Sequence, residues 1–283
     1  MDGVLLINKQ KGITSRNVCD QVSKILETKK VGHIGTLDPF ATGLLIVLVG
    51  KATKCLQYFD DFAKTYTATI KLGEKTSTMD TEGNIIEQKE TPYLSREDIE
   101  DVLSSFLGKQ KQLPPMTSAI HVNGTKLYKL AHQGIEVERP LRDIEIFDIK
   151  LIDFSDEEIT FKATVSKGTY IRVLGNDIAE RLKTVGHLSS LNRDEIGPFS
   201  LKEAVSVGEF DSNSLHNIVD VLSRFCAVLK VDEQKAKDIM DGKIKEIDGD
   251  YKGDKLFIID INNNPIAMYN RINEKFIFSR GLF

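Results

Sequence analysis

The sequence predicts an α+β fold, in which a large domain on a mixed or largely antiparallel sheet is followed by a small β-rich module. Helix-like and strand-like segments mix over the first 228 residues without a regular alternation of strand and helix. After about Val228 the pattern changes to short, closely spaced strand-like runs. A length of 283 residues with 41% hydrophobic residues suits one large domain, or one large and one small.

The N-terminal third is predicted to contain three strands and one helix. Gly3–Asn8 forms a short apolar strand in this interpretation. A helix is expected from Ser15, its predicted N-cap, because apolar residues then recur every three or four positions. The uninterrupted aliphatic run Leu44–Val49 indicates a fully buried strand. Alternation over residues 66–72 indicates a half-buried strand.

The middle of the chain continues the mixture of elements. A helix is expected from Ser95 until Gly108, with its apolar residues on one side. Asn123-Gly124 between two strand-like runs is a strong signal for a two-residue hairpin turn. Residues 159–165 alternate as another strand, and Gly168 turns the chain into a further amphipathic helix.

The C-terminal segment is expected to form one helix and three strands. The helix covers Glu233–Asp241, and the strands cover Lys255–Ile261, Ile266–Asn270 and Lys275–Ser279. A unit of about 55 residues is below the size at which a core stabilises itself comfortably, so it should lean on the main domain. The expected boundaries are therefore 1–228 and 229–283.

Composition and charge exclude some classes of protein. No apolar run approaches the roughly 20 residues that cross a bilayer, and no signal-peptide core is present, so a cytoplasmic protein is expected. The three cysteines form no CxxC pair, so neither a disulfide framework nor a zinc site is indicated. The net charge of -4 argues mildly against nucleic acid, although residues 9–30 carry six basic and only two acidic side chains.

The most unusual segment is Gly32–Gly43, which lies between the first helix and a buried strand. Three glycines and one proline in twelve residues predict a tightly shaped loop, and this loop carries the carboxylate of Asp38 and the imidazole of His33. Taken alone, Asp38 also fits an ordinary turn and His33 an ordinary surface position. The pattern of a phosphate-binding loop is absent, and these two side chains alone do not make a metal site.

Residues 32–45, GHIGTLDPFATGLL, resemble the signature loop GHxGTLDPxAxGxL of the TruB family, the tRNA pseudouridine-55 synthases. The family proline is replaced by Gln10, and Ser77 stands where many members have aspartate. Other segments resemble further family motifs, in order: Val4–Lys9 with Gly12 and Ser15, Lys64-Thr65-Tyr66, Thr76 with Thr78, Asp80 and Gly83, Ser118-Ala119, the block from Gly124 to Gly134, Ser166–Arg172, and Leu191 with Arg193.

The resemblance implies an enzyme with a pseudouridine-synthase-like domain at 1–228 and a small PUA-like RNA-binding domain at 229–283. Within the first, residues 115–142 correspond to a loop that closes over RNA, which we call the clamp segment. The implied activity is isomerisation of the T-loop uridine at position 55 of tRNA to pseudouridine, by base flipping. It requires no cofactor or metal, and it implies tRNA as the partner, no obligatory protein partner and no membrane.

The resemblance also assigns roles to individual residues. Asp38 is the catalytic carboxylate, acting by attack on the sugar or through a glycal-type route. Arg172 is expected to pair with Asp38, and Tyr66 to stack on the base and assist proton transfer. Without the resemblance, Tyr66 fits an ordinary core position and Arg172 an ordinary surface position.

A second set of residues is expected to bind the RNA. Leu191 should contact the base, and His33 should fill or brace the space that the flipped base leaves. Tyr170 is also expected at the substrate. The expected phosphate contacts, each of which also fits a solvated surface residue, are Lys9, Lys11, Lys126, Lys129, Arg139 and Arg142.

Two other functions remain open at this point. One is an RNA-binding protein without catalysis, whose biological effect would survive loss of Asp38. The other is a pseudouridine synthase for a different RNA, such as a guide-RNA-dependent enzyme of the dyskerin type. An unrelated small-molecule enzyme is the least favoured, because it leaves the motifs unexplained.

Overall fold

The structure is a computed structural model that describes residues 1–282 apart from 119–120, 123–124, 128–129 and 131–132. Its centre is one ten-stranded mixed sheet. In chain order its strands are β1 (Gly3–Lys9), β2 (Val31–Ile34), β3 (Thr42–Val49), β4 (Lys64–Leu72), β7 (Gly108–Gln112), β10 (Arg142–Phe154), β11 (Glu158–Val165), β12 (Gly186–Ile196), β13 (Phe199–Ser200) and β14 (Val205–Ser206).

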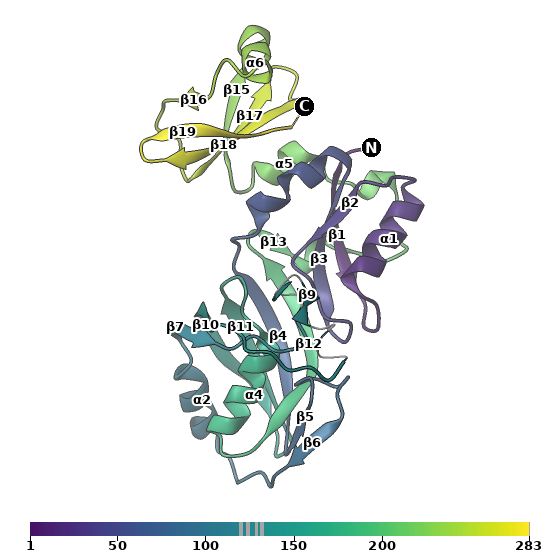
Figure 1. Ribbon diagram of the computed structural model, residues 1–283, viewed down its shortest axis with the longest axis vertical. Helices are drawn as coiled ribbons and strands as arrows, with labels where there is room; N and C mark the ends of the chain where they lie inside the picture. The colour runs from purple at the N-terminus through teal and green to yellow at the C-terminus, as the bar shows by residue number, and fades with distance from the viewer. Residues whose placement is uncertain (119–120, 123–124, 128–129, 131–132, 283) are drawn as a thin grey trace.

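The strand order is β14-β1-β3-β12-β4-β11-β10-β7, with β2 paired to β3 and β13 paired to β12. Most pairs are antiparallel, but β12 runs parallel to β3 and β14 runs parallel to β1. The expected α+β class with a mixed sheet is therefore confirmed. Strand β12 joins the two halves of the sheet, because it pairs with β3 on one side and β4 on the other (Figure 1).

Helices cover the two halves separately. Helix α1 (Ser15–Ile25) packs on the β1–β3 half, whereas α2 (Arg96–Ser104) and α4 (Ile171–Arg181) pack on the β4–β11–β10 half. The remaining short elements are the 3-10 helices η1 (Gly50–Phe59), η2 (Leu201–Glu203) and η3 (Ser212–Ser214), helix α5 (Ile218–Leu222), and the paired strands β5 (Glu74–Thr76) and β6 (Ile85–Gln88).

The start of α1 corrects one prediction. The N-cap is Thr14 and not Ser15: Thr14 has extended backbone angles and its side chain accepts from the amide of Asn17. Ser15 is instead the first helical residue, and it is buried. The predicted cap of the second helix is confirmed, because Ser95 accepts from the amide of Asp98.

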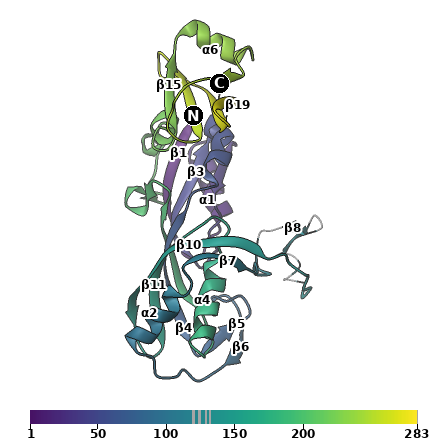
Figure 2. The ribbon, with the colours of Figure 1, turned by 90° about the vertical axis from the view of Figure 1, so that its left-hand side faces the viewer.

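The clamp segment contains two short paired strands. Strand β8 (His121–Val122) and strand β9 (Thr125–Lys126) are antiparallel, as the hairpin prediction requires, while the turn residues 123–124 lie outside the described residues. Figure 2 shows β8 at the end of a segment that projects from the main body. The base of the segment lies beside β10, whose first residues pair with β7.

The C-terminal part forms a separate five-stranded sheet. Its order is β15 (Ala227–Val231), β17 (Lys255–Asp260), β18 (Pro265–Ile272), β19 (Lys275–Gly281) and β16 (Glu246–Ile247), and α6 (Glu233–Met240) packs on it. The predicted helix and strands are present, whereas β15 and β16 were not predicted. The sheet also contacts the main domain, as expected: Lys255 Nζ donates to the Tyr58 carbonyl over 3.0 Å, and the Tyr58 hydroxyl donates to Ser279 Oγ over 2.8 Å.

None of the helices in the described part of the chain is long and apolar enough to cross a membrane.

Candidate active site

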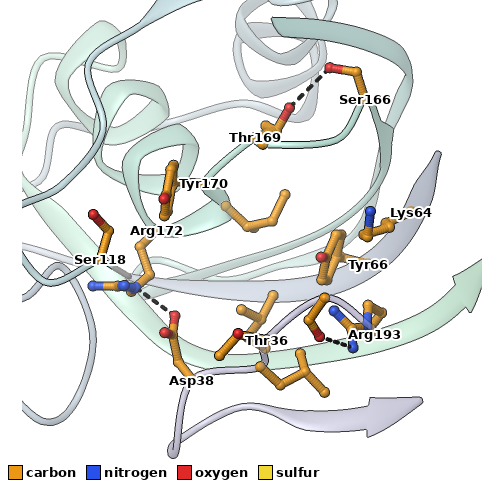
Figure 3. Close-up of a pocket in the computed structure, with 15 residues that line it drawn as sticks. Thr36, Asp38, Lys64, Tyr66, Ser118, Ser166, Thr169, Tyr170, Arg172 and Arg193 are labelled. Atoms are coloured by element: carbon orange, nitrogen blue, oxygen red, sulfur yellow. Dashed lines mark hydrogen bonds and ion pairs between the residues drawn. The ribbon is translucent and has the colours of Figure 1, made fainter. Parts of the chain in front are cut away.

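A pocket of about 270 Å³ opens where β4, β12, the loop before β3 and the first turn of α4 meet. Asp38, Tyr66, Tyr170, Arg172 and Leu191 line it (Figure 3). The sequence interpretation selected all five, and they come from four separate segments of the chain. The structure therefore brings together the three residues expected to be catalytic and two of those expected to bind substrate.

Contacts from α1 and β1 fix the loop that carries Asp38. The buried hydroxyl of Ser15 donates to the Leu37 carbonyl over 3.0 Å and accepts from the Leu37 amide over 2.8 Å. On the other side of Asp38, Lys9 Nζ donates to the Pro39 carbonyl over 3.3 Å. The residues that precede and follow Asp38 are thus both held from outside the loop.

Arg193, on β12, fixes the same loop from the sheet. Its guanidinium donates from Nε to the Leu44 carbonyl over 2.8 Å and from Nη2 to the Gly35 carbonyl over 2.9 Å. The backbone of Arg193 also approaches Gly43 so closely that a Cβ there would lie 2.4 Å from the Arg193 carbonyl oxygen. Gly43 has a φ of +104°, so this position needs glycine for both reasons.

The expected ion pair is present at the centre of the pocket. Arg172 Nε donates to Asp38 Oδ2 over 2.8 Å and lies 3.5 Å from Asp80 Oδ2. The other two guanidinium nitrogens bind backbone and hydroxyl oxygens: Nη1 donates to the Thr78 carbonyl (2.9 Å) and to Thr117 Oγ1 (2.6 Å), and Nη2 to the Thr117 carbonyl (2.9 Å). Arg172 is only 3% exposed, and this network compensates its buried charge.

Asp80 is a part of the site to which the sequence interpretation gave no role. Its Oδ1 accepts from Thr78 Oγ1 over 2.5 Å and from the Glu82 amide over 2.9 Å, which leaves Oδ2 directed at Arg172. The T-x-T-x-D motif contained the signal, but the motif alone does not say that its carboxylate reaches α4. Ser77, the family departure, lies in the same turn, and its amide donates to the Asn84 carbonyl.

The electrostatic environment sets the proton affinity of Asp38. Loss of water around the carboxyl raises its pKa above the ordinary value for aspartate, and the negative charge of Asp80 adds to the rise. Arg172 opposes the rise through its charge and its hydrogen bond, and Lys9 opposes it through its charge. Among these groups, Arg172 favours the ionised form of Asp38 most.

Tyr66 and Leu191 form a wall of the pocket from neighbouring strands. Tyr66 on β4 pairs with Arg193 on β12, and Leu191 lies two residues before Arg193 on the same face. Both side chains are mostly buried and belong to the main core cluster, yet both reach the pocket. Figure 3 shows the Tyr66 ring between Lys64 on one side and Asp38 with Arg172 on the other.

Tyr170 precedes α4 and is held by a residue that the sequence interpretation missed. The Tyr170 amide donates to Gln112 Oε1 over 2.8 Å, and Gln112 Nε2 donates back to the Tyr170 carbonyl over 3.1 Å. This pair of bonds ties β7 to the helix that begins one residue later and carries Arg172. Burial raises the pKa of the Tyr170 hydroxyl.

The phosphate-binding role expected for Lys9 is wrong. Lys9 is 0% exposed, and its ammonium donates to the carbonyls of Gln10 (3.0 Å), Ile13 (2.8 Å) and Pro39 (3.3 Å). Burial lowers its pKa to about 8. Its three donors are used inside the protein, so Lys9 supports the Asp38 loop instead of contacting RNA.

His33 faces a second cavity of about 690 Å³, which shares Asp38 and Arg172 with the first pocket. Its Nδ1 is buried and has no hydrogen-bond partner in the described part of the chain. Burial and the charges of Arg193 and Arg16 lower its pKa, which favours the neutral ring. That it braces the space left by a flipped base stays a prediction.

Of the other expected phosphate contacts, the three that the structure describes do not line either cavity. Arg142 and Lys11 are exposed, and Arg142 lines a shallow surface pocket next to Lys64. Arg139 instead donates to the Pro114 carbonyl over 2.9 Å and pairs with Glu136. Lys129 and the side chain of Lys126 lie outside the described residues. Within the described ranges, no group of three His, Cys, Asp or Glu side chains is placed to hold a metal ion.

Comparison with known proteins supports one interpretation of this site. Residues 23–171 match the model of the TruB family pseudouridylate synthase N-terminal domain. The tRNA pseudouridine synthase B of Geobacter sulfurreducens is 44% identical over 223 residues, which are 78% of this chain and 73% of that protein. The tRNA pseudouridine synthase B of Bacillus cereus is 38% identical, over 95% of this chain and 92% of that protein.

Solved structures agree on the fold. A Cbf5-Nop10-Gar1 complex contains a chain that superposes with a TM-score of 0.76 at 21% identity, covering 99% of this chain and 85% of that one. A chain of the archaeal box H/ACA sRNP Nop10-Cbf5 complex gives 0.72 at 18% identity, with 99% and 86% covered. At this identity the likeness shows the fold alone, but the sequence matches extend it: the chain belongs to the TruB family of pseudouridylate synthases.

Proposed function

We propose that this chain is a tRNA pseudouridine synthase that converts the T-loop uridine at position 55 into pseudouridine. The relatives named tRNA pseudouridine synthase B support tRNA as the substrate, since one of them aligns over 92% of its own length. The observation that carries the proposal is the Asp38–Arg172 ion pair on the wall of a pocket that also contains Tyr66.

The proposed reaction is an isomerisation. The bond between N1 of uracil and C1′ of the ribose breaks, the base turns within the pocket, and C5 forms a new bond to C1′. The proton on C5 leaves and N1 ends protonated, so the product has the atoms and the charge of the substrate. The chemistry therefore consists of a leaving group, a nucleophile or base at the sugar, and proton transfers.

Asp38 is the residue proposed to act at the sugar. It either attacks C1′ to form an ester or removes a proton from C2′ in a glycal-type route, and both need the ionised carboxylate. The hydrogen bond from Arg172 Nε occupies one oxygen of Asp38 and leaves the other toward the pocket. Arg172 thus orients the carboxylate and keeps it charged.

Tyr66 and Leu191 are proposed to hold the base. Tyr66 offers an aromatic face for stacking and a hydroxyl for proton transfer at the sugar, while Leu191 supplies an apolar surface. Tyr170 lines the same pocket beside Arg172 and is proposed to contact the substrate. A hydrophobic wall of this kind lets the detached uracil turn without leaving.

The uridine lies inside a folded loop of tRNA, so we propose that it is flipped out at a cost of about a few kcal/mol. The clamp segment, the C-terminal domain at 229–283 and His33 are proposed to offset this cost by contacting the RNA. The contact between Thr117 and Arg172 supports a link between the clamp segment and helix α4 of the same domain. Because tRNA is the substrate, we place the enzyme in the cytoplasm.

The test is an assay of purified protein on an unmodified tRNA transcript without added cofactor, with pseudouridine mapped by position. We expect product at position 55 with the wild-type protein and none with Asp38→Asn. Product at another position would contradict the substrate, and tight tRNA binding without product would indicate a non-catalytic RNA-binding protein.

A further inference from the structure

Two basic residues of the pocket have no part in the mechanism above. Lys64 lies two residues before Tyr66 on β4, and Arg193 on the neighbouring strand β12 pairs with Tyr66. Both therefore flank the residue proposed to stack on the base. Figure 3 shows them together on the side of Tyr66 away from Asp38. A Cβ on Gly35 would lie 3.3 Å from Lys64 Cε and 3.3 Å from Arg193 Nη1, which places the two cationic side chains next to each other.

The charges of the pocket do not balance at this end. Its lining contains one carboxylate, Asp38, against three cations, and the ion pairs of Asp38 and Asp80 belong to Arg172. In the part of the chain that the structure describes, no carboxylate forms an ion pair with Lys64 or Arg193. Arg193 is 1% exposed and its bonds go to neutral carbonyls. A buried guanidinium without a counter-ion is costly, so this end of the pocket favours an anion.

The surroundings of Lys64 agree with this conclusion. Its ammonium donates to the Phe62 carbonyl over 3.2 Å and keeps further donors for a ligand. Burial and the nearby charges of Arg193 and Lys167 lower the pKa of Lys64 to about 8, although the charges of Asp60 and Asp61 oppose the change. An anion placed between the two side chains would compensate the positive charge of both.

The position of Lys64 indicates which anion this is. Lys64 lines the active pocket and also a surface pocket of about 600 Å³ that contains Arg142, Lys167 and Gly168. A nucleotide inserted into the active pocket must leave its two flanking phosphates on a path out to the surface. Asp60 and Asp143 line the same surface pocket, but with Lys64, Arg142 and Lys167 the path through Lys64 keeps a net positive charge, whereas the opposite wall holds Asp38.

We propose that Lys64 and Arg193 form a phosphate subsite for the RNA backbone, binding one of the two phosphodiesters that flank the target uridine. The inference rests on the proposed function, because it needs RNA as the ligand. In this arrangement the phosphate anchors the sugar while the base is detached, so that C1′ stays in place beside Asp38 as the uracil turns.

The test combines a protein change with a substrate change. The probe is a T-arm RNA hairpin in which the phosphate 5′ or 3′ of the target uridine is replaced by a neutral methylphosphonate. Binding is measured in the Asp38→Asn background, with Lys64 intact or changed by Lys64→Gln. Lys150→Gln, a change at an exposed lysine on β10, is the matched control.

We expect one of the two methylphosphonates to weaken binding by the Lys64 protein roughly tenfold or more, as for loss of a charged hydrogen bond. Lys64→Gln should cost a similar factor on native RNA and nothing further on that methylphosphonate RNA. It should also reduce the slope of log affinity against log salt by about one. For the control Lys150→Gln, the factors by which the protein change and the methylphosphonate weaken binding should multiply, because the two changes act independently.

The subsite would be overturned if Lys64→Gln weakened binding of both methylphosphonate RNAs by the same factor as binding of native RNA. It would also be overturned by a loss of kcat when Lys64→Gln is made in the enzyme with Asp38 intact, if RNA binding is unchanged, because this would indicate proton transfer by Lys64 instead. Arg193→Gln is measured in parallel with its thermal unfolding, because Arg193 also holds the loop. If the wild-type protein modifies position 55 and the cycle is additive, only the subsite fails, whereas no modification of any tRNA would contradict the proposed function itself.

Discussion

Arg172 binds Thr117 through both of its terminal nitrogens, Nη1 to the hydroxyl over 2.6 Å and Nη2 to the carbonyl over 2.9 Å, while its Nε binds Asp38. One guanidinium therefore connects the base of the clamp segment to the carboxylate of Asp38. Because the fork is planar and rigid, a shift of Thr117 is transmitted to the orientation of Asp38. With the clamp segment proposed to seat on RNA, this contact would couple its seating to the alignment of the Asp38 carboxylate.

This coupling predicts the effect of Arg172→Lys. A lysine carries the charge but reaches one partner at a time, so it cannot hold Asp38 and Thr117 together. We expect kcat/KM to fall on the order of 10²-fold, while tRNA binding falls much less. Single-turnover kinetics and a binding isotherm separate the two effects. The shared guanidinium is unimportant for catalysis if the lysine enzyme turns over at the wild-type rate.

Asp38→Asn tests the role of the carboxylate itself. The asparagine is nearly isosteric and keeps an oxygen for Arg172 Nε, so the fold and the pocket should persist. It has no negative charge to attack C1′ or to remove a proton from C2′, and turnover should become undetectable. Circular dichroism and tRNA binding serve as controls, and pseudouridine formation by the variant at a wild-type rate would contradict the mechanism.

The acid limb of the pH profile should report Asp38. Its pKa is raised by loss of water and by Asp80, and the active form is the ionised one, so kcat/KM should fall at a pH above the usual aspartate range. Asp80→Asn removes a neighbouring negative charge and should move this limb to lower pH. A limb that Asp80→Asn leaves in place or moves upward would count against the assignment to Asp38.

Lys9 supports the loop that carries Asp38, because its buried ammonium donates to three backbone carbonyls. Lys9→Met keeps the apolar stem but leaves the carbonyls of Gln10, Ile13 and Pro39 without a donor, which should lower the free energy of unfolding by about 2–4 kcal/mol. Lys11→Met, at an exposed lysine two residues away, is the control and should change stability by less than about 0.5 kcal/mol. Denaturant titration of both variants measures their free energies of unfolding, and equal stability of the two would contradict the supporting role of Lys9.

The same residue gives a signed dependence of stability on pH. The pKa of Lys9 is about 8 in the folded chain and near that of free lysine when unfolded, so the unfolded state binds more protons between these values. Wild-type stability should therefore rise relative to Lys9→Met as the pH increases above about 8. An unchanged difference between the two proteins from pH 7 to 10 would show that the ammonium is not desolvated.

Much of the fold was readable from periodicity, and the failures have physical causes. The apolar run of β3 and the alternation of β4 and β11 predicted these strands, because each faces a core directly. Strand β12 was missed, since it buries the charged side chain of Arg193 and therefore lacks a simple apolar pattern. Strand β15 was missed because its apolar residues form a short run that pairs only with β17 from farther along the chain.

The site divides in a similar way. Asp38, Tyr66 and Arg172 were predicted from motifs, and the structure places all three in one pocket. Three supporting residues were missed because each contacts a residue far along the chain. Thr117 and Asp80 lie 55 and 92 residues before their partner Arg172, and Gln112 lies 58 residues before its partner Tyr170. No local sequence pattern encodes such contacts. Lys9 was misassigned because a lysine next to basic neighbours resembles a surface residue until the surrounding carbonyls are known.

The proposed phosphate subsite also makes a prediction about pH. Lys64 has a pKa of about 8 in the free protein, where burial and the charges of Arg193 and Lys167 lower it and those of Asp60 and Asp61 raise it. A bound phosphate should raise that pKa, so above about 8 the free protein must take up a proton to bind, and RNA affinity should weaken as the pH rises toward 9.5. Lys64→Arg stays protonated throughout this range and should remove the dependence. Affinities of the Asp38→Asn background for a T-arm hairpin, measured with and without Lys64→Arg, test this directly. Parallel curves would mean that the titrating group lies elsewhere, because Lys9, which has a similar pKa, is present in both proteins and cannot produce a difference between them.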